Sequence, residues 1–335
     1  MRFFVLYSAE GEEVSQVKRV TFDAKFLRFL VALTITIGIF IFLLSRISFT
    51  SVMASLQKAD VSLIILAFLI SFGGNALMDA YRWKVILNYL RYPVSFREAL
   101  FIKIVANLFI SLLPLRSGEL SRLVYLKRLR NIPYAKSILS IIVEYCHKIF
   151  VLLVCLFTGI CLYFFENSRN HVVSGPYFFS SVFVPLCLLK LSIFKNVQTQ
   201  YDEKIKPHLT ELKGALTNRT ILFCNVLYSC GELINFYLLS KSLSIEVPFY
   251  AVLIFIPLVI FISALPFTIA GLGSRELTVL FLFKDYASPE VLLTLGVLYS
   301  FVEFLFPSFI GIFVIAAFTE RVLKPKNGNE ERTEK

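Results

Sequence analysis

Ten charged residues of this chain lie inside or directly beside long apolar stretches, where charges are costly and normally face a partner or a wet cavity. They are five cations and five carboxylates: Lys103, Arg116, Arg122, Lys148, Arg275, Glu119, Glu144, Glu232, Glu276 and Glu303. At about 1.5 Å per residue, Glu232 and Glu303 lie roughly 17 and 18 Å along their predicted helices. A balanced set of this kind can also pair internally and lock helices together, and this structural role is an alternative for each member.

Two motifs place arginine beside glycine where an apolar stretch is interrupted. LPLRSGELSR at 113–122 holds Arg116, Gly118, Glu119 and Arg122, and LPFTIAGLGSREL at 265–277 holds Gly271, Gly273, Arg275 and Glu276. A helix N-terminus offers free N–H groups and a positive dipole end, and glycine lets a ligand approach the backbone. Arginine adds donors that match phosphate oxygens. The motifs therefore predict a site for a phosphorylated lipid headgroup.

The apolar stretches that hold these residues are long enough to cross a membrane. The chain has 335 residues, of which 57% are hydrophobic, 35 are phenylalanine and only 17% are charged. A helix of about 20 residues spans the hydrocarbon core of a bilayer. The stretches that reach or approach this length are 26–44, 61–77, 138–165, 172–194, 221–239 and 291–318. Two shorter ones, 99–113 and 251–265, have 15 residues each and stop at a proline.

The basic residues indicate how the chain lies in the membrane. If each short stretch dips in and returns on the same side, segments 1–28, 81–97, 116–136, 195–219 and 321–335 share one side and hold 25 of the 34 Lys and Arg residues. The opposite loops hold five, and the cytoplasmic side carries such an excess. We therefore predict an all-α polytopic membrane protein with six spanning helices and two re-entrant hairpins, about eight membrane segments, with both termini cytoplasmic. Eight complete spans, two of them short and tilted, are the alternative.

Each predicted half has three crossings and one hairpin, so the second half runs inverted relative to the first. An inverted repeat with broken helices is a recurring plan of transporters. The predicted transmembrane domain covers residues 26–318, with half-repeats at about 26–165 and 172–318. A cytoplasmic segment 1–25 precedes it and a cytoplasmic tail 319–335 follows. The expected location is the cell membrane, inner or plasma.

Other kinds of chemistry are not indicated. The net charge of +11 is spread over short loops, so no nucleic-acid partner is expected. The six cysteines form no CxxC pair, and neither a metal site nor a cofactor is expected. Asp79 and Arg82, three residues apart and followed by Trp83, are typical of an interfacial anchor with a local ion pair.

Several of these features together resemble the flippase-like membrane domain of lysylphosphatidylglycerol synthases. They are Arg82 with Trp83, Asn107 with LPLRSGELSR, the intramembrane Glu144, and LPFTIAGLGSRE at 265–276. The resemblance extends from the first helix to about residue 318, and it implies a role in moving aminoacylated phospholipids or in glycolipid and polyprenyl-linked steps. It also implies functional roles for Asn107, Arg116, Gly118, Glu119, Arg122, Glu144, Gly271, Gly273, Arg275 and Glu276.

The chain departs from the family pattern in two places. The family often has Glu-Arg and then an acidic residue after the first hairpin, whereas Glu144 is followed here by Tyr145 and then Lys148. Because only a short tail follows residue 318, aminoacyl-transferase activity is not expected.

We therefore expect a non-enzymatic transporter that moves a phospholipid or a polyprenyl-phosphate-linked lipid between leaflets. The arginines of the two motifs would bind the phosphate, while the motif carboxylates with Glu232 and Glu303 would neutralise the empty site or pair with a headgroup cation. One alternative is a membrane-embedded glycosyl- or acyl-transferase with Glu119 or Glu144 as general base. Another is a membrane partner of a separate lipid synthase, and a homo-oligomer is also left open.

Overall fold

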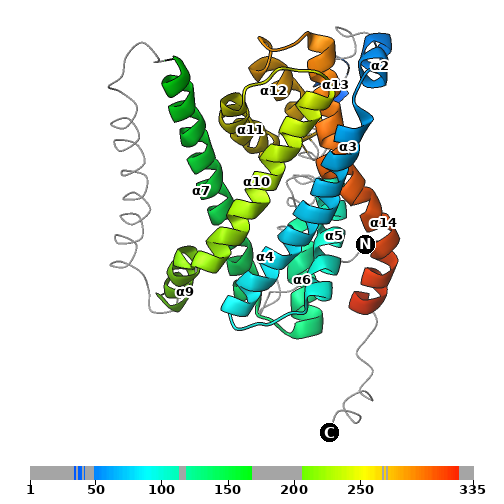
Figure 1. Cartoon of the computed structure of the whole chain (residues 1–335). Coiled ribbons are helices and arrows are strands. Elements are labelled where there is room, and N and C mark those ends of the chain that lie inside the picture. Colours follow the sequence, from blue (N-terminus) through cyan, green and yellow to red (C-terminus); the bar gives the residue numbers. More distant parts are fainter. Residues whose placement is uncertain are drawn as a thin grey trace.

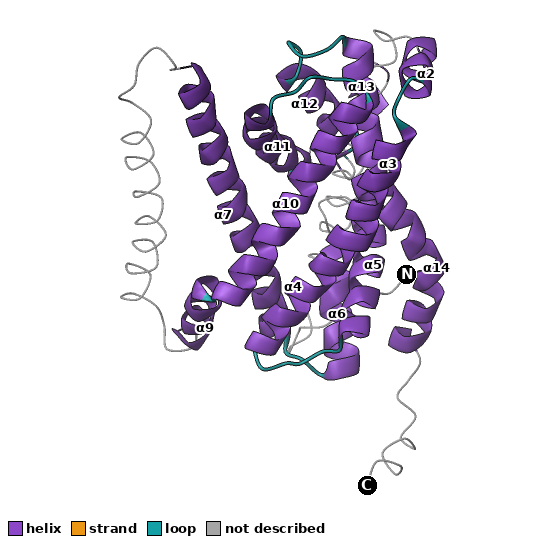
Figure 2. Cartoon of the chain, in the orientation of Figure 1, coloured by secondary structure: helices purple, strands orange, loops and turns teal. Residues whose placement is uncertain are grey.

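The computed structural model describes residues 34, 37–39, 41, 49–112, 118–167, 206–265, 268 and 271–323. Apart from short turns and loops, the described residues form helices, and none of them forms a strand (Figure 1 and Figure 2). Four helices in these ranges are long and apolar enough to cross a membrane: Val61–Tyr89, Tyr134–Glu166, Arg219–Ser242 and Pro289–Ile315. They coincide with four of the predicted spans. The predicted spans 26–44 and 172–194 lie outside the described residues, apart from isolated positions of the first.

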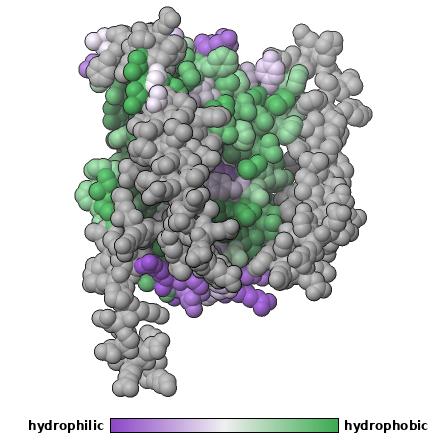
Figure 3. All heavy atoms as spheres, turned by 180° about the vertical axis from the view of Figure 1, so that it is seen from behind, coloured by the Kyte–Doolittle hydropathy of each residue, from purple (hydrophilic) through white to green (hydrophobic). Residues whose placement is uncertain are grey.

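The outer surface of these helices is apolar. Large side chains such as Leu69, Phe223, Phe281 and Phe313 are exposed. Among the coloured residues of Figure 3, apolar ones predominate at mid-height, and hydrophilic ones gather at the lower end. An extensive apolar surface of this kind is suited to lipid. Together with the four long helices, it identifies a multi-pass membrane protein.

The first long helix is built from three consecutive elements after the short helix α2 (Phe49–Gln57). These are α3 (Val61–Phe68), the π-helical η1 (Leu69–Asn75) and α4 (Ala76–Tyr89). Asp60 caps the start by accepting a hydrogen bond from the Ser62 backbone at 2.8 Å. The predicted span ends at residue 77, but the helix continues for three further turns and buries Trp83 completely. Asp79 and Arg82 therefore lie within the helix, and both side chains are buried.

A pair of shorter helices follows. α5 (Phe96–Leu112) and α6 (Leu120–Arg130) pack against each other and both lie in the lower half of Figure 1. Gly118 makes this contact close, because a Cβ atom there would lie 2.1 Å from the backbone nitrogen of Ile110. α6 ends at Asn131, whose φ of 52° is the left-handed conformation typical of a helix C-terminus. α7 (Tyr134–Asn167) then crosses the height of the molecule.

The second half of the described chain has a similar order of elements. α9 (Lys206–Thr217) is short, and α10 (Arg219–Ser242) is a long helix capped by Asn218. α11 (Phe249–Ala264) and α12 (Ser274–Leu282) are again short, and they lie in the upper part of Figure 1. The last long helix consists of α13 (Pro289–Ser300), the π-helical η4 (Phe301–Leu305) and α14 (Phe306–Leu323).

The two halves exchange equivalent contacts. α5 packs against α14, and in the same way α11 packs against α7. A glycine lies at each crossing: a Cβ on Gly311 would lie 2.7 Å from Cβ of Leu108, and a Cβ on Gly159 would lie 2.8 Å from Cβ of Leu253. Small residues allow helices in a membrane to approach closely. The short helices of each half are therefore held by the last long helix of the other half.

Candidate functional site

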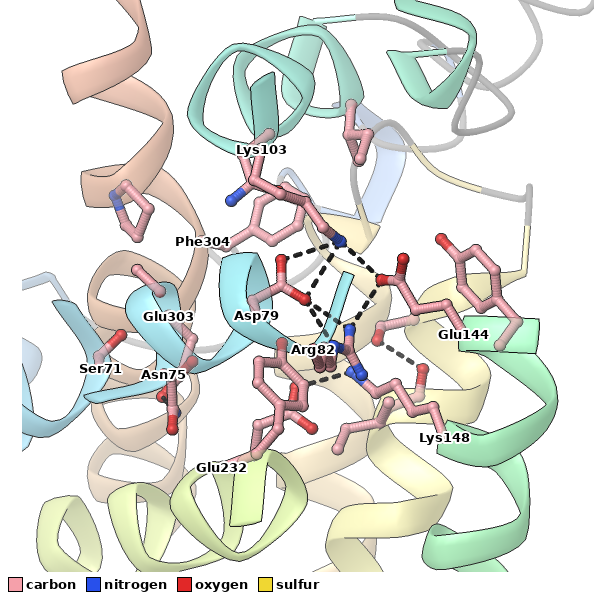
Figure 4. A pocket seen from close by; sticks show the side chains of 18 of the residues that line it. Ser71, Asn75, Asp79, Arg82, Lys103, Glu144, Lys148, Glu232, Glu303 and Phe304 are labelled. Carbon is pink, nitrogen blue, oxygen red and sulfur yellow. Dashed lines mark hydrogen bonds and ion pairs between the residues drawn. The ribbon is translucent and has the colours of Figure 1, made fainter. Parts of the chain in front are cut away.

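A polar cavity of about 140 Å³ lies where the two halves meet (Figure 4). Elements of both halves line it, from η1 and α4 to α14. Its charged lining residues are Asp79, Arg82, Lys103, Glu119, Glu144, Lys148, Glu232, Arg275 and Glu303. Such a concentration of charge inside an apolar protein is expensive unless the charges serve a ligand or one another. A charge that is paired with another residue serves the fold, whereas a charge without such a partner is available to a ligand.

Arg82 lies at the centre of the largest group of charges. Its Nε donates to Asp79 Oδ1 at 2.8 Å, and its Nη2 donates to Glu144 Oε1 at 2.8 Å. Its remaining terminal nitrogen, Nη1, donates to Asn225 Oδ1 at 2.8 Å. Cζ of Arg82 lies 4.1 Å from the ring centroid of Tyr228, within cation–π range. The guanidinium is therefore enclosed on all sides by protein groups.

Lys103 and Arg122 bring the first pair of short helices to the same carboxylates. Nζ of Lys103 donates to Glu144 Oε1 at 2.6 Å and lies 3.0 Å from Asp79 Oδ2. Nη1 of Arg122 donates to Glu144 Oε2 at 2.7 Å, and its Nη2 pairs with Glu119. Glu119 Oε1 in turn accepts from the Tyr145 hydroxyl at 2.7 Å.

These residues form a closed set of three carboxylates and three cations, which we call the central ion-pair network: Asp79, Glu119, Glu144, Arg82, Lys103 and Arg122. Their side chains are at most 16% exposed, so water screens them little. Each charge has at least one opposite partner. The network is neutral as a whole because it contains three carboxylates and three cations. Its geometry indicates that it clamps α5 and α6 onto α4 and α7, and Arg122 is fully buried behind it, without lining the cavity.

A separate ion pair joins α7 to α10. Nζ of Lys148 donates to Glu232 Oε1 at 2.8 Å and lies 4.9 Å from the ring centroid of Tyr228. Oε2 of Glu232 is buried and has no hydrogen-bond partner among the described residues. This pair is neutral too, and it leaves one carboxylate oxygen unused.

Glu303 has amide partners in place of a cation. Its Oε1 accepts from Asn75 Nδ2 at 3.3 Å and from Asn235 Nδ2. Glu303 lies on η4 and Asn75 on η1, so both π-helical segments meet at this carboxylate. π-helical turns inside α-helices are frequent at functional sites.

Arg275 is also buried at the cavity, at 6% exposure, but it makes no ion pair with any described residue. Its Nη1 donates to Ser300 Oγ at 3.1 Å, and its Cζ lies 5.1 Å from the ring centroid of Phe304. Ser300 Oγ donates in turn to Glu276 Oε1, so a hydroxyl separates the guanidinium from the nearest carboxylate. Arg275 therefore has unused donor capacity beside the cavity.

A side chain from the first turn of α12 caps the N-terminus of this helix. Oε2 of Glu276 accepts from the backbone N–H of Gly273 at 2.6 Å. Gly271 and Gly273 have φ of 76° and 83°, a conformation that side chains with a Cβ rarely adopt. Both glycines therefore allow a tight turn before α12, while the predicted approach of a ligand to their backbone stays a prediction. The Gly273 N–H, however, is not free for a phosphate in this structure.

The predicted site residues are distributed unevenly around the cavity. Those that line it are Asn107, Glu119, Glu144, Glu232, Arg275 and Glu303. Those that lie behind the lining are Gly118, Arg122, Gly271, Gly273 and Glu276. Arg116 lies outside the described residues.

Sequence reasoning missed Asp79 and Arg82 as members of the site. The local ion pair predicted for them is present, with Arg82 Nε 2.8 Å from Asp79 Oδ1, but both side chains are buried at the cavity. A signal was available, because Asn75, Asp79 and Arg82 recur at spacings of four and three and so share one helix face. Tyr228, Glu232 and Asn235 show the same spacing on α10.

The described residues include no group of three or more His, Cys, Asp and Glu side chains arranged to hold a metal ion. The described cavity lining combines paired charges with Asn75, Asn107, and two charged residues that form no described ion pair, Arg275 and Glu303.

A protein-family model described as "Lysylphosphatidylglycerol synthase TM region" matches residues 29–311 of the chain. The matched range contains every described residue that lines the cavity. No curated protein matches the chain.

Proposed function

The chain belongs to the family of lysylphosphatidylglycerol synthase TM regions, and from this membership and its polar cavity we propose that it moves a phospholipid or a lipid-linked glycan between membrane leaflets. Family membership implies a membrane protein of lipid metabolism or transport. Translocation itself is the part that we propose. The site would be the cavity between the two halves, and the membrane the cell membrane.

Arg275 is the observation that carries this proposal. Arg275 is buried and makes no ion pair with a described residue, and its guanidinium matches a phosphate in bidentate geometry. The guanidinium has one hydrogen bond to a described residue, from Nη1 to Ser300. The other donors are free to bind two oxygens of a lipid phosphate.

The charges that are already paired have a different role in this proposal. Arg122 is neutralised by Glu119 and Glu144, which makes it a structural anchor of α6 in place of a phosphate ligand. Both oxygens of Glu144 already accept hydrogen bonds from cations of the chain, which leaves no free oxygen for a substrate proton and disfavours a general-base role. The geometry thus favours transport over the transferase alternative.

The arrangement of helices supports an inverted repeat. We propose that α5 with α6, and α11 with α12, are re-entrant hairpins that enter from opposite sides, since the first pair lies low and the second high in Figure 1. The reciprocal packing of α5 on α14 and of α11 on α7 fits two halves of inverted orientation. In this topology both termini face the cytoplasm.

A liposome assay tests the proposal. The purified chain is reconstituted with phosphatidylglycerol that carries a fluorescent label on one acyl chain, and inward or outward movement is measured by chemical quenching of the outer leaflet. Arg275→Gln should slow translocation about tenfold or more, because one charge-assisted hydrogen bond contributes about 1.5–3 kcal/mol. Lys284→Gln, at an exposed lysine on the loop after α12, should leave the rate unchanged.

Two results would contradict the proposal. One is an equal translocation rate for the Arg275→Gln variant and the unaltered chain, which would show that Arg275 is not the phosphate site. The other is a new lipid species in mass spectra of the liposome lipids after addition of sugar or acyl donors, which favours a transferase.

A further inference from the structure

Two charged residues on the cavity remain unpaired once all described ion pairs are assigned: Arg275 and Glu303. The central ion-pair network is neutral, and so is the pair of Lys148 with Glu232. Arg275 is the expected site of a phosphate. Glu303 has no role in binding that phosphate, because two negative charges repel each other.

Only one oxygen of the Glu303 carboxylate accepts hydrogen bonds from described residues. Oε1 accepts both amide hydrogen bonds, from Asn75 and Asn235. Oε2 makes no hydrogen bond with a described residue, and the side chain lines the cavity. Figure 4 shows Glu303 and Asn75 together at one side of the cavity. One oxygen atom of this half-buried carboxylate therefore remains available at the cavity.

The charged and titratable groups around Glu303 come from several elements. They are Asp79 and Arg82 on α4, Lys103 on α5, Lys148 on α7, Tyr228 and Glu232 on α10, Arg275 on α12, and Tyr299 on α13. All of the cations in this set except Arg275 are bound to carboxylates. Hence Arg275 is the one cation of the described cavity lining that could compensate Glu303.

The charge balance of the cavity changes when a lipid phosphate binds. Arg275, Glu276 and Glu303 together carry a net charge of −1, since the other described charges of the site cancel. A phosphodiester adds a further −1. Two uncompensated negative charges in an apolar surrounding repel strongly, because the low dielectric does not screen them. Binding of one cation restores the charge of the empty site.

We propose that Glu303 takes up a proton when a lipid phosphate binds at Arg275, so that headgroup binding is linked to protonation. The O–H bond forms at Oε2, the proton comes from the solvent that reaches the cavity, and it returns to solvent when the headgroup leaves. No electron transfer is involved. This inference rests on the proposed function, since it needs a phosphate-bearing ligand at Arg275.

A proton fits this site better than a metal ion. The described hydrogen-bond partners of Glu303 are N–H groups of two asparagines, and the described residues include no group of three or more His, Cys, Asp and Glu side chains arranged to hold a metal ion. A proton needs only one free oxygen, which Oε2 supplies. The amide hydrogen bonds to Oε1 remain unchanged by that protonation.

Calorimetry in buffers of different ionisation enthalpy measures the linkage directly. The full chain is placed in nanodiscs of phosphatidylcholine and titrated with short-chain dihexanoylphosphatidylglycerol over about pH 5 to about pH 9. We expect the uptake of about one proton per bound lipid at its maximum, and a binding constant that falls by up to about tenfold per pH unit on the alkaline side. Glu303→Gln keeps the shape and the acceptor oxygen, so it should bind the lipid without proton uptake.

Two further variants separate this inference from the proposed function. Glu246→Gln changes an exposed carboxylate and should match the unaltered chain. Arg275→Gln should lose binding and with it the proton uptake. Infrared spectra of the unaltered chain offer a measurement without any variant, because a protonated carboxyl C=O band should appear on lipid binding and shift in heavy water.

Four outcomes would overturn the inference. If the unaltered chain binds the lipid with no proton uptake, protonation is not linked to binding, although the proposed function stands. If Glu303→Gln still takes up the proton, another group is responsible. If binding depends on sodium concentration and not on pH, the cation is a metal ion. Absence of lipid binding by the unaltered chain removes the Arg275 site and this inference with it.

Discussion

Replacing Glu144 with glutamine should destabilise the folded chain more than any other single loss of a carboxylate. Glu144 accepts hydrogen bonds from Arg82, Lys103 and Arg122 at 2.6 to 2.8 Å. Its side chain is 5% exposed, so water cannot replace the lost charge. The variant leaves three buried cations facing two carboxylates.

The magnitude follows from the burial of the network. Removal of one partner from a buried ion pair costs about 3–5 kcal/mol, because the remaining charge stays buried and uncompensated. The three hydrogen bonds to Glu144 share the same carboxylate, so their separate contributions do not add. We therefore expect the free energy of unfolding to fall by about 3–5 kcal/mol in total.

The assay is unfolding of the purified chain in detergent micelles by titration with dodecyl sulfate, followed by circular dichroism. Glu98→Gln provides a matched control, because it makes the same substitution in the pair with Arg130, whose side chain is 48% exposed. The Glu98 side chain is 10% exposed, but its half-exposed partner is screened by water, so this pair should contribute about 1 kcal/mol or less. The double variant Glu144→Gln with Lys103→Met restores equal numbers of positive and negative charges and should recover at least half of the lost stability.

The reasoning is refuted if Glu144→Gln costs no more than Glu98→Gln. It is also refuted if the double variant is less stable than Glu144→Gln alone, since uncompensated positive charge would then not be the cause. In either case the central ion-pair network would not be what holds the first pair of short helices.

Two further predictions concern packing and the second ion pair. Gly118→Ala should reduce the yield of folded chain severely, because the added Cβ would lie 2.1 Å from the Ile110 backbone nitrogen. Gly74→Ala is the control and should be tolerated, because its Cβ meets no atom within 4 Å. Size-exclusion profiles in detergent compare the two variants. Lys148→Gln should lower the free energy of unfolding by about 3 kcal/mol, because Glu232 loses its cation. Adding Glu232→Gln should restore most of the lost stability. The same dodecyl sulfate titration measures both variants, and an equal loss in the double variant would contradict the charge argument.

The all-helical membrane fold could be predicted from the sequence because hydrophobic length is a local property. A run of apolar residues has to cross the bilayer as a helix, whatever its neighbours are. Spans 138–165 and 221–239 correspond to α7 and α10 with ends that differ by only a few residues. The predicted span 61–77 is shorter than the helix Val61–Tyr89, because Asp79 and Arg82 look like a polar end in sequence, although both are buried in the fold.

The candidate site could be predicted in composition but not in pairing. The charges within apolar stretches were visible, and Glu119, Glu144, Glu232, Arg275 and Glu303 do line one cavity. Which of them are neutralised depends on contacts between residues that are far apart in the chain. Arg122 was a predicted phosphate ligand, and it is fully buried in two ion pairs.

The sequence by itself determined the class of the protein, its apolar helices and the set of charges that the membrane would make costly. Only the tertiary structure decided that most of the described charges form ion pairs, and that Arg275, Glu276 and Glu303 do not form one with a described residue. The physical reason is that the energy of a buried charge depends on the distance to its nearest opposite charge. That distance is set by the packing of α4, α7, α10 and α12 around the cavity, and no single stretch of sequence contains it.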